Sequence, residues 1–169
     1  MEQSKRPALV ALCRILAEED VAYALIGGLA LQMHQREPRT TLDIDVAVID
    51  RKMIPAARLS GAGFRLHASF EHSENWTAAD GTPVQFSDDP VLSPAIRRAE
   101  EFALDEVTLR VIRVTDLLHE KFRAARDPAR RRSKRLQDLA DVQALLESHP
   151  ALQNELTADE KAFLGTLPA

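Results

Sequence analysis

Apolar residues recur along the chain with two different periods, and the change of period predicts how the chain is organised. Between residues 7 and 19, apolar positions at Leu9, Leu12, Cys13 and Leu16 repeat with helical spacing. Short runs such as "VAYALI" and the alternating "VTLRVIRV" predict strands instead. From Thr115 onward every signal is helical. We therefore expect a mixed α/β half, about residues 20–114, followed by an all-helical tail.

Glycine and proline residues divide each half into separate helices and strands. Gly27-Gly28 ends the first strand, and "LALQMHQR" predicts a helix that ends before Pro38. In order, the other expected elements are a strand over 41–49, a helix in "KMIPAARLSGAG", a strand in "GFRLHA", a hairpin in "NWTAADGTPVQFS", and helices over 116–126, 134–147 and from 158. The segment 90–106 fits either a helix start at Ser93-Pro94 or a strand around Phe102. Short turns between the strands predict an α+β fold with a mixed or antiparallel sheet, flanking helices and a C-terminal helical tail.

Composition narrows the class of protein without naming a function. The 169 residues are 45% hydrophobic and 28% charged, which suits one soluble domain with its own core. We expect residues 1–114 to form the core and residues 115–169 to pack on it as part of a single compact unit. A single cysteine excludes an internal disulfide, and we expect Cys13 to be a buried structural thiol. The N-terminus does not resemble a signal peptide and no apolar run reaches 18 residues, so the expected location is the cytoplasm, with no membrane partner.

Two aspartates interrupt the strand pattern of Leu42–Val48. Alternation places Leu42, Ile44, Val46 and Val48 on one face and Asp43, Asp45 and Ala47 on the other. Neighbouring carboxylates repel each other unless something neutralises them, and Mg²⁺ binds one or two carboxylates together with substrate phosphates. The alternative is an edge strand with a solvated face, where two acids are harmless.

A glycine pair lies upstream of these aspartates, between a strand and a helix. Gly27 and Gly28 would let a phosphate approach the backbone, and the free N–H groups of a helix N-terminus favour an anion. The alternative is a plain strand-to-helix turn. Arg36 and Arg39 in the following loop could add charge to a phosphate site or could be solvated.

The stretch "IGGLALQMHQREPRTTLDIDVAV" resembles the signature of the nucleotidyltransferase superfamily with the polymerase-beta-like fold. The resemblance implies that Asp43 and Asp45 coordinate Mg²⁺ (or Mn²⁺) on a nucleoside triphosphate. It also implies that Gly27 and Gly28 lie beside the phosphates, where we expect Arg39 of the connecting loop to add positive charge. In such enzymes the metal positions the triphosphate and neutralises charge at the phosphorus.

The helical tail contains a lysine at an apolar position. Winding 116–126 as a helix places Lys121 among Leu117, Leu118 and Phe122, so it either reaches out to solvent or points into a site. In the next helix the apolar stripe is expected at Leu136, Leu139, Val142 and Leu146. Arg135 and Asp138 lie along its edge, where they could form a modest i, i+3 pair.

Charge is also concentrated in this tail. Residues 121–135 contain eight basic residues and one acid, a net charge of +7, which leaves −11 for the rest of a chain whose net charge is −4. Such a segment can bind RNA phosphates, as a transferase acting on tRNA would require, or can be a solvated loop and helix start.

The segment "LLHEKFRAARDPARRRSKRLQDLADVQALL" resembles the tail of AbiEii-like nucleotidyltransferases, a group that includes toxins of toxin–antitoxin systems. The resemblance implies that Lys121 contacts the triphosphate and that Asp138 completes the polar site, with Arg135 or Lys134 in support. It departs from the wider superfamily at Gln85, where active members often have a third carboxylate. A carboxylate there would act as general base on the acceptor hydroxyl.

The sequence therefore predicts a Mg²⁺-dependent nucleotidyltransferase that modifies a hydroxyl group of tRNA or a protein, with a cognate antitoxin as a further partner. Two alternatives stay open. One is an adenylyltransferase acting on small molecules such as aminoglycosides. The other, suggested by Gln85, is a catalytically silent nucleotide-binding or antitoxin-like protein.

Overall fold

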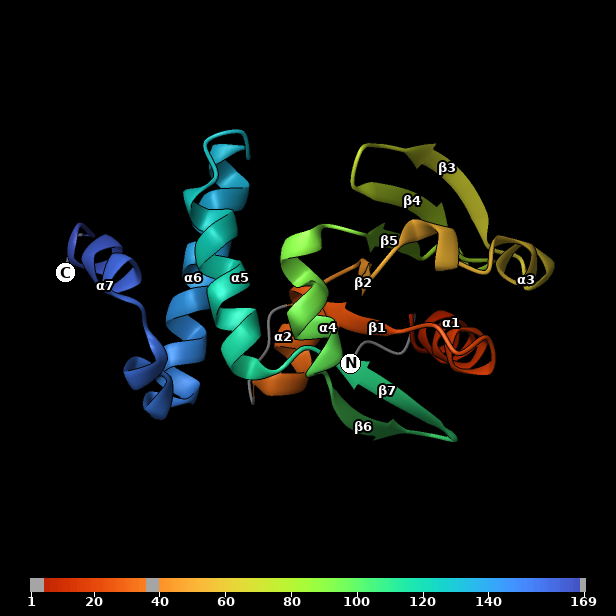
Figure 1. Cartoon of the computed structure of the whole chain (residues 1–169), viewed down its shortest axis with the longest axis horizontal. Helices are drawn as coiled ribbons and strands as arrows, with labels where there is room; N and C mark the ends of the chain where they lie inside the picture. Colours follow the sequence, from red (N-terminus) through yellow and green to blue (C-terminus); the bar gives the residue numbers. More distant parts are fainter. Residues whose placement is uncertain (1–4, 36–39, 168–169) are drawn as a thin grey trace. The chain divides into compact units, whose positions relative to one another are not determined.

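The computed structural model describes residues 5–35 and 40–167, and these divide into two compact units (Figure 1). Unit 1 is Met1–Met33 with Glu37–Arg113, and unit 2 is His34–Arg36 with Val114–Ala169. In the part of the chain that the structure describes, no helix is both long and apolar enough to cross a membrane.

Unit 1 is built on a seven-stranded sheet. Its strands are β1 (Tyr23–Ile26), β2 (Ile44–Val48), β3 (Arg65–Ser69), β4 (Ser73–Thr77), β5 (Pro83–Ser87), β6 (Glu100–Leu104) and β7 (Val107–Val111). They lie in the order β3-β4-β5-β2-β1-β7-β6. The β1–β7 and β2–β5 pairs are parallel and the other pairs are antiparallel, so the sheet is mixed. This arrangement confirms the predicted α+β class.

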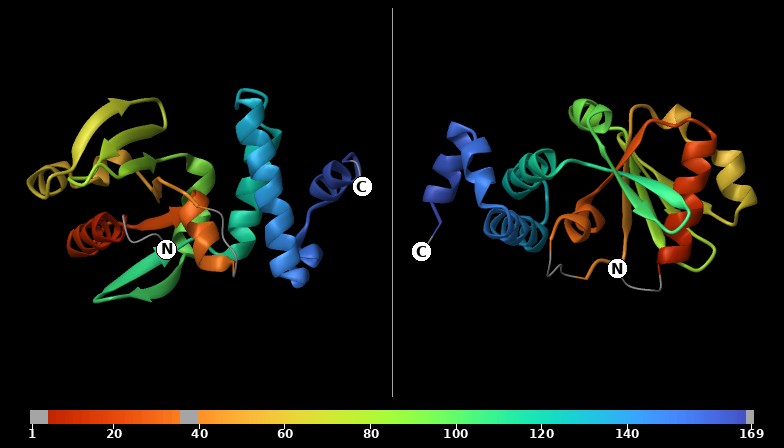
Figure 2. Two further views of the ribbon diagram at one scale, coloured as in Figure 1. Left: turned by 180° about the vertical axis from the view of Figure 1, so that it is seen from behind. Right: turned by 90° about the horizontal axis from the view of Figure 1, so that it is seen from below.

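Short helices connect and flank these strands. They are α1 (Arg6–Glu18), α2 (Gly27–His34), α3 (Ala56–Gly61) and α4 (Ser93–Arg97), with 3-10 turns η1 (Arg51–Met53) and η2 (Pro90–Leu92). Helices α1 and α3 lie side by side, and α4 contacts β1 and β2 (Figure 2). The ambiguous segment 90–106 contains both alternatives, since α4 begins at Ser93 and β6 includes Phe102.

The central strands β1 and β2 carry the core of unit 1. Ile44, Val46 and Val48 are buried on the face that alternation predicts. Ala47 is also fully buried, because β2 has a neighbour on both sides and its other face is covered in part. Leu42 is an error of the sequence prediction: it is 70% exposed, because β2 begins only at Ile44.

Unit 2 is helical. It contains α5 (Val114–Arg126), α6 (Arg132–Ser148), the 3-10 turn η3 (Pro150–Glu155) and α7 (Ala158–Gly165). A capping box begins α7, because Thr157 accepts from the Glu160 N–H and Glu160 accepts from the Thr157 N–H. Phe122 of α5 packs edge-to-face on Phe163 of α7, with 6.3 Å between ring centroids.

The buried face of α6 differs from the predicted stripe. Leu136 is 56% exposed, whereas Asp138 and Asp141 are buried together with Val142 and Leu145. These four follow the spacing i, i+3, i+4 and i+7, so they form one helical face. A pattern that counts only apolar residues placed the buried face of α6 wrongly, because two residues of that face, Asp138 and Asp141, are charged.

Candidate functional site

The turn from β1 into α2 brings an acidic side chain against the backbone. Gly27 has φ +64°, a conformation that only glycine adopts readily, and it is the first residue of α2. A Cβ atom at this position would lie 2.3 Å from Oδ2 of Asp45. The strand register agrees, since Ile26 of β1 lies opposite Asp45 of β2. Gly27 is therefore required both by its backbone angle and by the close approach of a carboxylate.

Gly28 has a separate reason to be glycine. A Cβ there would lie 2.7 Å from Oγ1 of Thr41, a buried residue of the segment that leads into β2. The Thr41 carbonyl in turn accepts a hydrogen bond from the buried ammonium of Lys5. Sequence reasoning missed Lys5, because its burial depends on a contact with a residue 36 positions away.

The two aspartates differ in their surroundings. Asp45 is half-buried within β2, and Asp43 is exposed immediately before that strand. Strand β2 lies between β1 and β5, so the alternative of a solvated edge strand is wrong. Two carboxylates on one strand end match the number that Mg²⁺ usually takes from protein, with the rest supplied by phosphates and water. Among the described residues, no group of three or more His, Cys, Asp or Glu side chains could hold a metal ion, so a metal bound by Asp43 and Asp45 would need further ligands from substrate and water.

A row of polar side chains continues from Asp45 across the sheet. Gln85 of β5 lies in register with Asp45, and Asn75 of β4 lies in register with Gln85. Paired residues of neighbouring strands project from the same face, so the three share one surface. The position next to Asp45 therefore carries an uncharged amide.

A cavity of about 280 Å³ opens on this surface. Its polar lining includes Asp43, Gln85, Asn75 and Thr77, together with His67 of β3. His67 lies where the β3–β4 register shifts between Leu66 and Ala68, a β-bulge that the sequence pattern did not indicate. The cavity thus joins one of the two aspartates to neutral hydrogen-bonding groups and a histidine.

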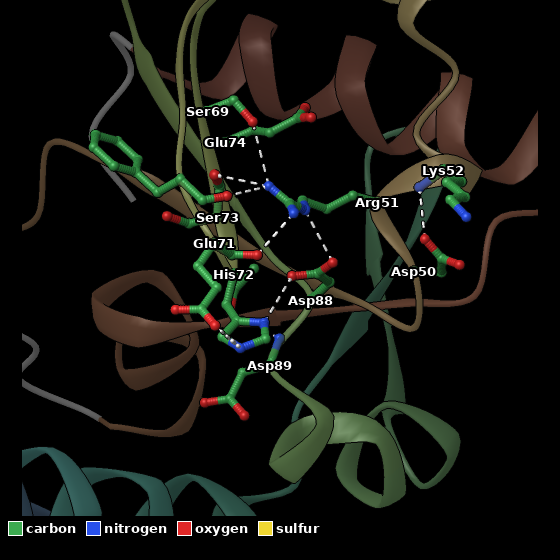
Figure 3. A network of polar contacts seen from close by, with 12 residues as sticks. Asp50, Arg51, Lys52, Ser69, Glu71, His72, Ser73, Glu74, Asp88 and Asp89 are labelled. Atoms are coloured by element: carbon green, nitrogen blue, oxygen red, sulfur yellow. Dashed lines mark hydrogen bonds and ion pairs between the residues drawn. The ribbon is translucent and has the colours of Figure 1, made fainter.

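The nearest acids after β5 have other partners (Figure 3). Asp88 binds Nε of Arg51 at 2.9 Å and lies 3.6 Å from Nδ1 of His72. Arg51 also donates to the carbonyls of Phe70 and Glu71, so these bonds hold the β3–β4 turn against η1. Asp89 accepts from the Val91 N–H and caps η2. Both acids thus bind neighbouring groups, although Oδ1 of Asp88 has no hydrogen-bond partner among the described residues, and Gln85 occupies the position beside Asp45.

Unit 2 contains a buried ion cluster at Lys121. The Lys121 ammonium lies 3.0 Å from Asp138 and 2.7 Å from Asp141, and all three side chains are at most 7% exposed. Arg130 binds the second oxygen of Asp138 at 2.6 Å. The formal charges of these four groups sum to zero, which is the condition for burying two carboxylates. Asp141 was missed by sequence reasoning, although its i+3 spacing from Asp138 places both on one helix face.

The remaining predicted residues are placed as follows. Arg135 donates from Nε to the Ala125 carbonyl at 3.1 Å, and thereby joins the first turn of α6 to the end of α5. Arg36 and Arg39 lie outside the described residues. The expected meeting of Lys121 and Asp138 with the Asp43–Asp45 site stays a prediction.

Comparison with known proteins identifies a protein family that this chain matches. A family model described as "Nucleotidyl transferase AbiEii toxin, Type IV TA system" matches residues 49–168, more than half of the chain. No curated protein sequence matches the chain. The matched region includes Gln85, Lys121, Arg130 and Asp138, and begins after the two aspartates.

Solved structures share the fold at low sequence identity. The antigenic nucleotidyltransferase-like protein of Paracoccidioides brasiliensis aligns with TM-score 0.57 and 19% identity, over 86% of this chain and 77% of that one. The antibiotic-resistance factor ANT(2'')-Ia aligns with TM-score 0.61 and 14% identity, over 98% and 100%. The lincosamide antibiotic adenylyltransferase LnuA aligns with TM-score 0.57 and 13% identity, over 86% and 96%. These likenesses show that the chain has the nucleotidyltransferase fold.

Proposed function

Because the chain belongs to the AbiEii nucleotidyltransferase toxin family of type IV toxin–antitoxin systems, we propose that it moves a nucleotidyl group from a nucleoside triphosphate to a hydroxyl group. The observation that carries the proposal is the contact between Asp45 and the Gly27 backbone. It puts a carboxylate and a glycine turn at the start of a helix side by side, so one ligand could meet both. A metal–polyphosphate has the two matching parts: a cation for the carboxylates and oxygens for N–H groups.

Asp43 and Asp45 would hold Mg²⁺ or Mn²⁺, and Gly27 and Gly28 would leave room for the phosphates. The metal would neutralise charge on the transferring phosphorus and on the leaving pyrophosphate. Asp43 is exposed and Asp45 is half-buried, and both lie at the start of a central strand that has a neighbour on either side. Arg39 belongs to the same proposal through its place in the loop before Asp43. Lys121, Asp138 and Arg135 of unit 2 belong to it through the family resemblance.

The cavity beside Asp43 is proposed as the place of the acceptor. Its lining of Asn75, Thr77, Gln85 and His67 can orient a hydroxyl group through hydrogen bonds. Aminoglycoside adenylyltransferases do not usually carry the Lys121…Asp138 pattern, which argues against an aminoglycoside. We therefore favour a tRNA or protein acceptor in the cytoplasm, and a cognate antitoxin as the regulating partner.

One observation favours a second candidate. Gln85 stands in register with Asp45, where a carboxylate would accept the proton of the attacking hydroxyl. A glutamine cannot accept that proton at neutral pH. A protein that binds the nucleotide without transferring it is therefore the runner-up.

Two measurements test the proposal. Calorimetry with each triphosphate, with and without Mg²⁺, measures binding to wild-type protein and to the Asp43→Asn, Asp45→Asn double variant. We expect metal-dependent binding that the variant loses, with an unchanged unfolding temperature because neither side chain lies in the apolar core. Wild-type protein without any metal-dependent signal would exclude the transferase and the silent binder alike.

Incubation with labelled triphosphate then separates transfer from binding. Total tRNA, a protein extract and a set of aminoglycosides are offered as acceptors in separate reactions. Label on tRNA or protein supports the proposal, and label on an aminoglycoside selects the small-molecule alternative. Tight binding with label on none of them selects the silent protein.

A further inference from the structure

The turn between α5 and α6 holds one arginine in a fixed position. Helix α5 ends at Arg126, and the Asp127 carboxylate then accepts from the Ala129 N–H at 2.9 Å. The Asp127 carbonyl accepts from the Arg130 N–H at 3.2 Å. These bonds fix the backbone at Arg130, just before α6 begins at Arg132.

The side chain of Arg130 is anchored at one end only. Its Nε donates to Oδ2 of Asp138 at 2.6 Å, and within the described chain the guanidinium has no other bond. The side chain is 40% exposed, whereas that of Asp138 is 3% exposed. The two terminal amino groups of the guanidinium therefore remain available to a ligand on the open side.

Asp138, which binds Arg130, is itself held by a second cation. Lys121 binds the other oxygen of Asp138 and also Asp141, so Asp138 is held between two cations. A buried carboxylate with both oxygens bonded has little freedom to turn, and it fixes the plane of the arginine that it binds. Lys121 binds both carboxylates and is buried, so Arg130 is the more exposed of the two cations in this cluster.

The surroundings favour an anionic ligand. Arg131, Arg132 and Lys134 are exposed next to Arg130, and residues 121–135 have a net charge of +7. A planar guanidinium with free terminal N–H groups matches the oxygens of a phosphate. Ordinary surface arginines lose side-chain freedom when they bind, and an arginine already held in place loses less.

We propose that Arg130 binds phosphate, and that Asp138, Lys121 and Asp141 are its positioning residues. The inference deepens the proposed function and rests on it for the source of the phosphate, which is either the nucleoside triphosphate or the backbone of an RNA acceptor. In both cases the terminal N–H groups of the Arg130 guanidinium would donate hydrogen bonds to phosphate oxygens.

The test measures binding in EDTA, so that the Asp43–Asp45 site cannot contribute. One arm titrates ATP by calorimetry, and the other titrates a short fluorescent RNA by anisotropy. Arg130→Gln is compared with Arg123→Gln, a matched control that removes the same charge from α5, where Arg123 pairs with Glu120. We expect Arg130→Gln to weaken binding about tenfold in one arm, and the control to change it less than about twofold.

The arm that responds identifies the source of the phosphate.

The positioning role of Asp138 has its own readout. Asp138→Asn should weaken binding in the wild-type background and have no further effect in the Arg130→Gln background. A purely structural aspartate would give the same loss in both. Circular dichroism verifies that Arg130→Gln, a change at the surface, keeps the helices.

Three outcomes would overturn the inference: equal effects of Arg130→Gln and Arg123→Gln, no effect of Arg130→Gln in either arm, or wild-type protein that binds neither ligand without metal. The Asp43→Asn, Asp45→Asn variant should retain this metal-free binding. A failure of the proposed transferase activity is thereby distinguished from a failure of the phosphate site.

Discussion

At the scale of single residues, the glycine turn makes the sharpest demand on side-chain identity. Changing Gly27 to Ala would force a Cβ into a site 2.3 Å from the Asp45 carboxylate, at a backbone angle that costs an ordinary residue about 1–2 kcal/mol. We expect Gly27→Ala to displace Asp45 and to weaken Mg²⁺-dependent triphosphate binding by more than about tenfold.

Gly61 offers the matched control for that change. It lies in α3, and a Cβ there meets no atom within 4 Å. Gly61→Ala should bind the triphosphate as the wild type does and should unfold at the same or a slightly higher temperature. Wild-type affinity in Gly27→Ala would show that the Asp45 position does not matter for binding.

The single cysteine gives a second prediction at this scale. Cys13 is fully buried, as the sequence predicts, and burial raises the pKa of its thiol to about 12, although a hydrogen bond with Tyr23 opposes the shift. The thiolate that reacts with Ellman's reagent is therefore scarce at pH 8. We expect the native protein to be unreactive and the denatured protein to release one equivalent, and rapid reaction of the native protein would contradict the burial.

Some residues of the candidate site could be singled out from the sequence because the signals that mark them are local. Gly27, Asp43 and Asp45 stand out because strand alternation and glycine conformations depend on near neighbours alone. The buried positions of Lys5 and Asp141 depend on partners elsewhere in the fold: Thr41 and Lys121. A periodicity that counts only apolar residues cannot recognise a charged residue as part of the core.

At the scale of elements, α5 and α6 are joined by that buried charge cluster. Removing Lys121 leaves Asp138 and Asp141 in a buried place with one partially exposed arginine to balance them. Breaking a buried ion pair from one side typically costs about 3–5 kcal/mol. We expect Lys121→Met to lower the free energy of unfolding of unit 2 by an amount in that range, measured by urea denaturation followed through helical circular dichroism.

A variant in which neutral side chains replace all three buried charges separates charge from packing. Lys121→Met combined with Asp138→Asn and Asp141→Asn removes the uncompensated carboxylates while it keeps similar side-chain volumes. The triple variant should be more stable than Lys121→Met alone. If Lys121→Met is as stable as the wild type, the cluster contributes nothing to the folding of unit 2.

At the same scale, strand β2 shows why the fold class was predictable and its details were not. The alternation of Ile44, Val46 and Val48 was sufficient to identify a strand. Its central place between β1 and β5 arises from a parallel pairing with a strand some 40 residues later, which no local pattern encodes. That pairing is also what brings Gln85 next to Asp45.

At the scale of the whole molecule, we expect the two units to unfold together. The sequence-based expectation is that the helical segment packs on the core. Unit 2 is small, and a domain below about 70 residues seldom gains more than about 3–5 kcal/mol from its own core. A buried four-charge cluster adds little net stability of its own. Unit 2 should therefore depend on unit 1.

Trp76 allows this dependence to be measured. It is the only tryptophan, it is buried in β4 of unit 1, and it packs on Phe86. Its fluorescence reports unit 1 alone, while the far-ultraviolet helical signal also contains a large contribution from α5, α6 and α7 of unit 2. If the units fold together, Lys121→Met should lower the urea midpoint of both signals equally. A midpoint that falls for the helical signal alone would mean that the units unfold independently and that the predicted packing is wrong.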